Sequence, residues 1–395
     1  MSKTEMPSIR FGGFDNAWEQ RKLGECFSER VENMPDGELI SVTINDGIKK
    51  FSELGRHDNS NDDKSKYKKV CVGDIAYNSM RMWQGASGYS PYEGIVSPAY
   101  TVLSPNAGVF SRCIAYQFKL PQMVHTFQIN SQGITSDNWN LKYPTLSEIE
   151  IYISKSVVEQ KQIAEFFTSL DNLITLHQRK YEKLQAFKVS MLEKMFPKDG
   201  ADVPEVRFKG FDGSWEKMPA SELFTSYVDK GHPELPVLSA TQDAGMVVRN
   251  EIGKSVFHEA ANEVGYKRVL PGQFVIHLRS FQGGFAHSAI EGITSPAYTV
   301  FGLKEPENHD DYFWKYVFMS KQFIKRLETV TYGIRDGRSI SYDEFLTLDF
   351  LFPRKEEQSL ICQYLLKLDS LIAMRKQELD KLQFIKKALL EKMFV

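Results

Sequence analysis

The chain has 395 residues, of which 42% are hydrophobic and 25% are charged, and its formal net charge is −2 at pH 7. This composition excludes a disordered or fibrous protein, and the length favours two or more domains with separate cores. No apolar run approaches the roughly 20 residues of a membrane span, and the first residues show no secretory signal, so we expect a cytoplasmic protein. The slightly acidic charge argues mildly against a chain that holds nucleic acid alone.

The first part of the chain consists of short runs rich in β-branched and aromatic residues, separated by glycine and proline. Such runs predict short strands joined by turns. The predicted strands of this half are Leu39–Ile44, Asp74–Asn78, Ala99–Leu103 and Ile149–Ile153.

A long helix is predicted to follow, because residues 158–196 contain neither proline nor glycine. Its apolar residues advance in steps of three and four, for example from Ile163 to Phe167, which is the seam of a coiled coil. His177 and Lys188 interrupt this seam. A polar residue in such a position weakens helix pairing but can define its register.

The second half of the chain repeats the first after a linker, Pro197–Glu205, whose prolines, glycine and acidic residues interrupt the apolar pattern. Ile9–Glu19 returns as Val206–Glu216, and the hexapeptide SPAYTV of Ser97–Val102 returns as Ser295–Val300. The order of the blocks is the same in both halves, which indicates a tandem duplication.

The elements predicted in this half are strands at Phe274–Leu278 and Leu348–Phe352 and short helical stretches near Asp311–Thr329. A second long helix is predicted to the chain end, with Arg375 and Lys386 in its seam. About 40 helical residues extend about 60 Å, too far for the helix to bury its apolar stripe on one small globule. We therefore expect the two long helices to pair with each other, antiparallel about an internal two-fold axis. Pairing with a second chain is the alternative.

Catalytic motifs are missing from the sequence. SPAY loosely resembles the Asp/Asn-Pro-Pro-Tyr motif of adenine methyltransferases, but serine and alanine stand at two of its positions, and no glycine-rich cofactor turn precedes it. There is no phosphate-binding loop, HExxH or GxSxG motif. His287–Ser288 has no evident third partner and is expected to be an exposed loop pair.

The four cysteines have no zinc spacing and are expected to be free thiols: Cys26, Cys71, Cys113 and Cys362.

The duplicated blocks are interpreted as structural. SPAYTV would form a turn that enters a strand and buries its aromatic residue. The Phe-Gly-Phe…Trp blocks would hold the start of each half against a neighbouring element, through Phe11, Phe14 and Trp18 and through Phe208, Phe211 and Trp215.

Polar loops in corresponding places of the two halves are the candidates for binding. Arg81–Gln84 follows a predicted strand, as Arg279–Gln282 does, and Gly133–Tyr143 corresponds to Tyr332–Tyr342 before the last strand of each half. Arginine, lysine, asparagine and glutamine carry donors that match base edges in the major groove of DNA. These loops therefore suggest DNA contact.

The doubled RFxGFxxxW start, the doubled Gly-Ile-x-Ser-Pro-Ala-Tyr block and the two helices ending in LEKMF resemble the specificity subunit of type I restriction–modification enzymes. The resemblance covers nearly the whole chain. It implies an α+β protein with two strand-rich target-recognition domains that each read one half of a split DNA sequence. It also implies an antiparallel coiled coil that sets the gap between the halves. The expected division is domain 1 at 1–156, helix at 157–196, linker at 197–205, domain 2 at 206–355 and helix at 356–395.

The resemblance implies a non-catalytic subunit, and the sequence itself offers no candidate metal site. The residues predicted to contact bases are Arg81, Trp83, Gln84, Ser136, Asn138, Trp139 and Asn140 in the first half and Arg279, Phe281, Gln282, Arg335, Asp336, Arg338 and Ser339 in the second. Predicted phosphate contacts are Lys49, Lys50, Arg56, Lys66, Lys68, Lys69, Lys254, Lys267 and Arg268.

The implied partners are double-stranded DNA and two methyltransferase subunits that carry S-adenosylmethionine, and ATP- and Mg-dependent restriction subunits can join them. The helices and the Phe-Gly-Phe…Trp blocks are expected to dock the methyltransferase. Because the loops of the two halves differ, we expect an asymmetric target. Two alternatives stay open at this point: an adaptor that binds proteins or glycans, and a catalytic DNA adenine methyltransferase.

Overall fold

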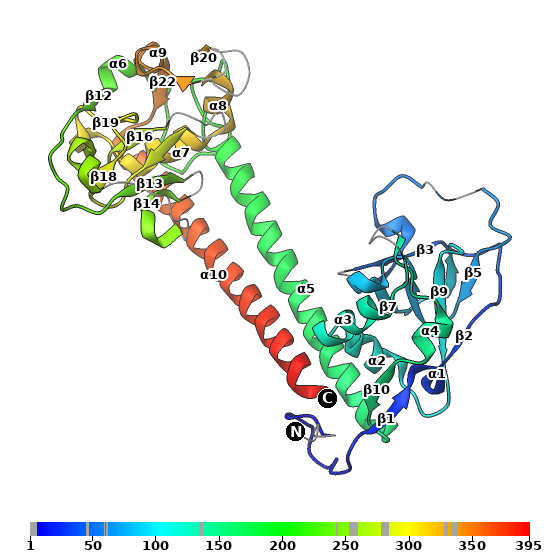
Figure 1. Ribbon diagram of the computed structural model, residues 1–395. Helices are drawn as coiled ribbons and strands as arrows, with labels where there is room; N and C mark the ends of the chain where they lie inside the picture. The colour runs from blue at the N-terminus through cyan, green and yellow to red at the C-terminus, as the bar shows by residue number, and fades with distance from the viewer. Residues whose placement is uncertain are drawn as a thin grey trace. The chain divides into compact units, whose positions relative to one another are not determined.

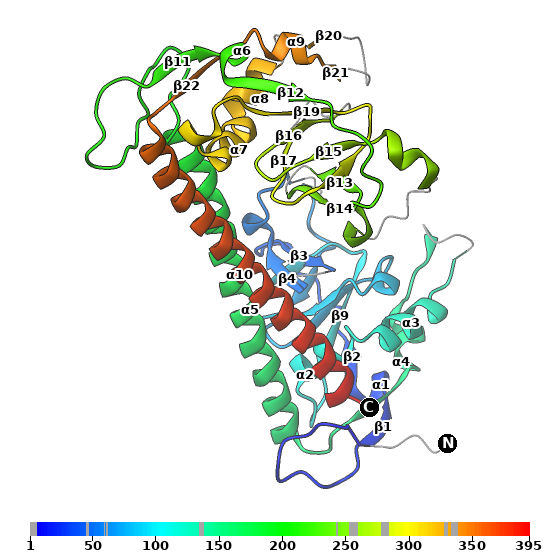
Figure 2. The same ribbon diagram turned by 90° about the vertical axis from the view of Figure 1, so that its left-hand side faces the viewer.

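The computed structural model divides into two compact units, each built from a globule and parts of both long helices (Figures 1 and 2). Unit 1 comprises Met1–Gln178 and Gln377–Val395, and unit 2 comprises Arg179–Lys376. The structure describes residues 6–44, 47–58, 60, 62–133, 138–241, 244–252, 260–277, 284–327, 331–332 and 339–395. Within these, the side chains of 251–252, 260–262, 331–332 and 339–340 are not described.

The globule of unit 1 is built on an antiparallel sheet of four strands in the order β2 (Phe27–Glu29), β9 (Tyr100–Pro105), β6 (Ile75–Asn78) and β7 (Ser87–Tyr89). Three further antiparallel pairs surround it: β1 (Glu19–Lys22) with β10 (Glu150–Ile153), β3 (Ile40–Thr43) with β4 (Gly47–Lys50), and β5 (Lys68–Val70) with β8 (Gly94–Val96). Its short helices are α1 (Leu23–Cys26), α2 (Ser111–Gln117), α3 (Pro121–Asn130) and α4 (Tyr143–Ser147).

The globule of unit 2 repeats this strand order, with β12 (Phe224–Tyr227), β19 (Thr299–Leu303), β16 (Phe274–Ile276) and β17 (Phe285–His287). The surrounding pairs are β11 (Glu216–Pro219) with β22 (Asp349–Phe352), β13 (Leu238–Thr241) with β14 (Gly245–Val248), β15 (Lys267–Val269) with β18 (Gly292–Thr294), and β20 (Thr331–Tyr332) with β21 (Ser339–Ile340). Its short helices are α6 (Ala220–Leu223), α7 (Asp311–Met319), α8 (Lys321–Leu327) and α9 (Tyr342–Phe345). The shared topology confirms that the second half is a structural copy of the first.

The duplicated hexapeptide forms the same turn in both units. The amide of Tyr100 donates to the carbonyl of Ser97 at 3.0 Å, and that of Tyr298 donates to Ser295 at 3.1 Å. Each turn leads into the second strand of its four-stranded sheet, and the valine that ends each copy is fully buried. SPAYTV is therefore written twice because each central sheet needs the same entry turn.

The long helices are α5 (Val157–Lys194) and α10 (Lys355–Met393), within two residues of the predicted bounds (Figure 1). Unit 1 pairs the start of α5 with the end of α10, and unit 2 pairs the end of α5 with the start of α10. In unit 1 the Nζ atom of Lys386 lies 2.5 Å from Oδ1 of Asp171, and in unit 2 Lys188 forms an ion pair with Asp369. The helices are thus antiparallel within one chain. The predicted five-part division treats each long helix as a separate part, whereas each compact unit contains segments of both helices. That division therefore stays a prediction.

The end of each long helix packs on the tryptophan block at the start of the opposite repeat. In unit 1 the rings of Trp18 and Phe394 lie 6.0 Å apart, and in unit 2 those of Trp215 and Phe196 lie 6.2 Å apart. Both tryptophans are buried. The predicted apolar role of the Phe-Gly-Phe…Trp blocks fits these contacts.

A buried ion pair also holds the start of each repeat on a long helix. In unit 1, Nε and Nη2 of Arg10 lie 2.5 and 2.9 Å from the carboxylate of Glu159, whose side chain is fully buried. In unit 2, Arg207 makes the same two contacts with Glu357 at 2.7 and 2.8 Å. The carboxylate raises the pKa of each arginine, chiefly through the hydrogen bond.

Glu159→Ala is expected to destabilise unit 1 by about 3 kcal/mol, because it leaves the Arg10 guanidinium largely buried without its partner. Urea unfolding of the full chain measures the loss. Glu165→Ala, at an exposed position of the same helix, should change stability by about 0.5 kcal/mol or less. Equal effects of the two substitutions would show that the ion pair does not hold the segment.

Candidate nucleic-acid interface

The two predicted reading loops of the first half lie together in unit 1. One is the 3₁₀ turn η2 (Met82–Gln84) after β6, and the other lies between α3 and α4. The rings of Trp83 and Trp139 meet edge to face, with their centroids 5.3 Å apart. The amide of Leu141 also donates to the carbonyl of Ser79 at 2.9 Å, so backbone and side-chain contacts join the two loops.

Local hydrogen bonds determine the shape of the first loop. The side chain of Asn78 accepts from the amide of Met80 at 3.0 Å, and Nε1 of Trp83 donates to the carbonyl of Met80 at 3.1 Å. Gly85 ends the turn with φ of 81°, in the left-handed region that favours glycine.

The second loop is closed by a short antiparallel bridge. The amides and carbonyls of Gln132 and Asn140 exchange hydrogen bonds of 3.0 and 2.9 Å. Gly133 is required beside this bridge, since a Cβ atom there would lie 2.6 Å from the carbonyl oxygen of Asn138.

We call Met80, Arg81, Trp83 and Trp139 the Trp83 patch. Met80 and Arg81 are exposed, and both tryptophans are partly exposed. Burial raises the pKa of the neighbouring Tyr100 hydroxyl, while its hydrogen bond with Asn78 and the charge of Arg81 act in the opposite direction. The patch therefore offers a guanidinium beside apolar and aromatic surface, a combination that suits guanine edges and thymine methyl groups.

The other predicted base contacts of this half differ in their exposure. Gln84 and Asn140 are partly buried, and Oδ1 of Asn140 has no hydrogen-bond partner within the described residues. Asn138 is exposed, and Ser136 lies outside the described residues.

Sequence reasoning missed Lys119, which positions the first loop. Its ammonium group donates to the carbonyls of Gly85 and Ile44 at 2.7 and 3.0 Å, and burial lowers its pKa to about 8. Lys119 thus links the end of η2 to the β3–β4 hairpin at the edge of a cavity of about 600 Å³. A lone lysine after a short helix carries no sequence signal of this role.

Most of the second-half candidates lie outside the described residues: Lys254, Arg279, Phe281, Gln282, Arg335, Asp336 and Arg338. The backbone of Ser339 lies in β21, which pairs with β20 on either side of residues 333–338. This pairing corresponds to the bridge that closes the second loop of unit 1.

Many predicted phosphate contacts are already paired with acidic residues. Lys50 lies 2.8 Å from Glu38, Lys68 lies 3.5 Å from Glu29, and Lys69 lies 3.1 Å from Glu32. The hydrogen bond to the partner carboxylate raises the pKa of both Lys50 and Lys69. In unit 2, Arg268 pairs with Glu291 and Asp229, while Lys267 donates to the carbonyl of Tyr298 and burial lowers its pKa. Lys49 is partly buried, whereas Arg56 and Lys66 are exposed.

The expectation that His287 and Ser288 form an exposed loop pair is wrong. Both are buried at the end of β17, where Nε2 of His287 lies 2.5 Å from a carboxylate oxygen of Asp311. The Ser288 hydroxyl donates to the carbonyl of Ile290 at 2.6 Å. The serine is therefore oriented toward its own turn and is not activated by the histidine.

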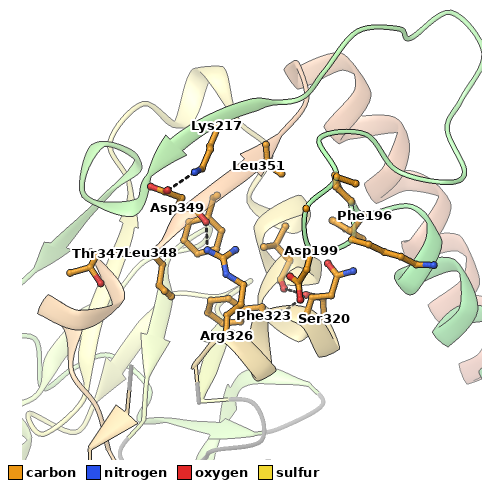
Figure 3. A pocket seen from close by; sticks show the side chains of 17 residues that line it. Phe196, Asp199, Lys217, Ser320, Phe323, Arg326, Thr347, Leu348, Asp349 and Leu351 are labelled. Carbon is orange, nitrogen blue, oxygen red and sulfur yellow. Dashed lines mark hydrogen bonds and ion pairs between the residues drawn. The ribbon is translucent and has the colours of Figure 1, made fainter. Parts of the chain in front are cut away.

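A cavity of about 410 Å³ in unit 2 lies between the linker start, α8 and β22 (Figure 3). Lys217 forms an ion pair of 2.7 Å with Asp349, and Arg326 donates to the Asp349 carbonyl. The two cationic side chains at this cavity are therefore already paired with groups of Asp349. Across the described ranges, no group of three metal-ligating side chains is placed to hold an ion.

The comparisons with known proteins agree on type I restriction–modification systems. Residues 16–186 match the family described as type I restriction modification DNA specificity domain. The type I restriction enzyme MjaVIII specificity subunit of Methanocaldococcus jannaschii is 23% identical over 353 residues, covering 82% of this chain and 81% of that protein.

Two solved structures share the fold. The S subunit of a type I restriction–modification system from M. genitalium superposes with a TM-score of 0.58 and 14% identity, covering 99% of both chains. A chain from a study of complex assembly and conformational transition in the type I R-M system gives a TM-score of 0.54 and 15% identity, over 95% of this chain and 97% of the other.

Proposed function

Because the chain belongs to the family of type I restriction–modification specificity subunits, we propose that its two repeats read the two halves of a split DNA target. The chain is the DNA sequence-specificity subunit and not itself an enzyme. The observation that carries the proposal is the Trp83 patch, where two loops distant in sequence meet with an exposed arginine. Neither an adaptor for proteins or glycans nor a catalytic methyltransferase finds support in the comparisons.

The proposed target is asymmetric, with a gap between its two halves. The Trp83 patch has a different composition from its counterpart in the second repeat, where Arg279, Phe281, Arg335 and Arg338 are the proposed contacts. Unlike contact residues select unlike bases. The antiparallel helices join the two readers and would set the gap, as a two-fold protein matches the spacing of two half-sites.

The proposed partners are two methyltransferase subunits that supply S-adenosylmethionine, and restriction subunits that use ATP and Mg can join them. The long helices carry exposed apolar side chains for such docking: Leu173, Leu176 and Phe384 in unit 1 and Phe187 and Met374 in unit 2. Partner subunits would also supply phosphate contacts, since this chain carries a net charge of −2. None of the helices in the described ranges combines the length and apolar character of a bilayer span.

Mapping N6-methyladenine across the host genome, with the gene intact and deleted, tests the proposal. We expect one split motif, with two short unlike halves around an unread gap, to lose its methylation in the deletion strain. Expression of the gene from a plasmid should restore it. An unchanged map, together with no methyltransferase copurifying with the chain, would refute the proposed function.

Arg81→Ala in the assembled complex should weaken binding to the target by about tenfold to a hundredfold and relax the preference at one base of one half-site. Arg56→Ala is the contrasting variant, since a phosphate contact weakens binding to all sequences about equally and lowers the salt dependence. Binding of the target and of single-base variants at several salt concentrations separates the two. Uniform weakening by Arg81→Ala would exclude a base contact.

A further inference from the structure

One cluster of three side chains occurs twice, once in each unit, where the long helices meet the globule. In unit 1, Nζ of Lys386 on α10 lies 2.5 Å from Oδ1 of Asp171 on α5. The hydroxyl of Tyr116 on α2 donates to Oδ2 of the same aspartate at 2.8 Å. The lysine also lies 5.8 Å from the centre of the tyrosine ring, within the range of a cation–π contact.

In unit 2 the same cluster consists of Lys188 on α5, Asp369 on α10 and Tyr316 on α7. Lys188 forms an ion pair with Oδ1 of Asp369, and the Tyr316 hydroxyl donates to Oδ2 at 2.8 Å. The lysine lies 5.6 Å from the tyrosine ring centre. In both clusters the lysine comes from one repeat, and the aspartate and tyrosine come from the other.

The lysines occupy seam positions that the heptad pattern otherwise fills with apolar residues. Only 17% of the Lys188 side chain and 27% of the Lys386 side chain are exposed. A charge withdrawn from water is tolerated where a partner carboxylate and further hydrogen bonds compensate for the lost hydration. Each cluster supplies this compensation at one level of the helix pair.

Sliding one helix past the other by one heptad would break both ion pairs. In one direction Lys188 would come opposite Lys376, and Asp171 would come opposite Met393. In the other direction Asp171 would come opposite Leu379. Neither shift offers a new carboxylate to Lys188, so the charges favour the observed register over its neighbours, as buried polar residues do in other coiled coils.

The tyrosines connect this register to the globules. Tyr116 and Tyr316 belong to short helices of the two globules, and each donates to the aspartate that holds the lysine of the facing helix. Burial, and also the nearby carboxylate, raise the pKa of both hydroxyls, so they remain protonated donors at neutral pH. Each cluster therefore joins three elements: both long helices and one helix of a globule.

We propose that these two Lys–Asp–Tyr clusters fix the register of the long helices, and that they are thereby specificity-determining residues for the gap between the half-sites. The second part rests on the proposed function, because it requires that the helix pair spaces two DNA readers. The first part concerns the protein alone and can be tested without DNA.

The variant Lys188→Leu/Lys386→Leu keeps an apolar seam but removes the charges that select one register. Its matched control is Lys183→Leu/Lys381→Leu, which changes exposed lysines at equivalent positions of the same helices. A second variant exchanges the partners in the unit 1 cluster alone, with Lys386→Asp/Asp171→Lys, and should keep the single register. The unit 2 cluster stays unchanged in this variant, because an aspartate at position 188 would meet Lys376 after a slip of one heptad.

Disulfide trapping in the full chain reports the register. His177 and Glu378 approach to 3.4 Å, so His177→Cys with Glu378→Cys reports the observed register, and His177→Cys with Ile385→Cys reports a slip of one heptad. Cys71→Ser removes the only cysteine that is not buried. We expect the slipped bridge to rise about tenfold or more in the double-leucine variant and to stay at background in the control.

Methylation by the assembled complex reports the gap on DNA substrates whose gap varies one base pair at a time. One heptad of helix is about 10.5 Å, or about three base pairs of DNA, so the double-leucine variant should also methylate targets with gaps changed by about three base pairs.

No slipped bridge and one unchanged gap would overturn the register proposal while leaving the proposed function intact. A slipped bridge with an unchanged gap would overturn the link to spacing. If the unaltered complex methylates no split target, the proposed function fails, and the bridge alone still decides the register.

Discussion

Exchanging residues 20–155 for the equivalent stretch of another specificity subunit should change one half of the methylated motif and leave the other half unchanged. Both loops that form the Trp83 patch lie inside this stretch, as do all four strands of the unit 1 sheet. The long helices and the whole second repeat lie outside it. Methylation of the original motif should fall by roughly a hundredfold or more, because several mismatched base contacts at about 1–3 kcal/mol each add together.

Methylome sequencing of strains that carry the exchanged subunit measures this outcome. The matching exchange in the second repeat, residues 217–353, should change only the other half of the motif. The β1–β10 and β11–β22 pairs then move almost complete with their own globule, so the new junctions disturb little pairing. Changes in both halves after either exchange would contradict one reader per repeat.

Inserting one heptad into both long helices should lengthen the recognised gap by about three base pairs without changing either half-site. The favoured positions follow Gln178 in α5 and Lys376 in α10, where the two compact units divide each helix. Seven residues add about 10.5 Å of helix while preserving the seam, since the heptad restores the same face. Both insertion points lie outside the Lys–Asp–Tyr clusters, so the residues of each cluster stay together on the helix segments of their own unit.

A set of target duplexes with stepwise gaps measures this effect. Insertion into α5 alone is the control and should lower stability, because one helix then has seven residues with no matching length in its partner. Deleting one heptad from both helices should shorten the gap by a similar amount. New half-site bases after a paired insertion would contradict the role of the helices as a spacer.

The sequence by itself determined the duplication and the positions of several strands, and it favoured an antiparallel pair of the two long helices. β3, β6, β9 and β10 lie within the predicted strands or extend them by no more than two residues, because alternation and turn residues are local properties. The seam of α5 and α10 was also predictable, since a 3.5-residue period over about 40 residues requires an apolar partner. That the lysines could define register followed from their place in this seam.

Contacts between distant residues were decided only by the tertiary structure. Nothing in the spacing of the chain indicated that Asp171 and Tyr116 would meet Lys386, or that Trp83 would contact Trp139. A count of charges likewise cannot show that Lys50, Lys68 and Lys69 already face glutamates, which leaves Arg56 and Lys66 more accessible to phosphate. Periodicity reports which face of an element is buried, but the partner that a polar side chain meets depends on how the chain returns in space, and only the folded structure contains that information.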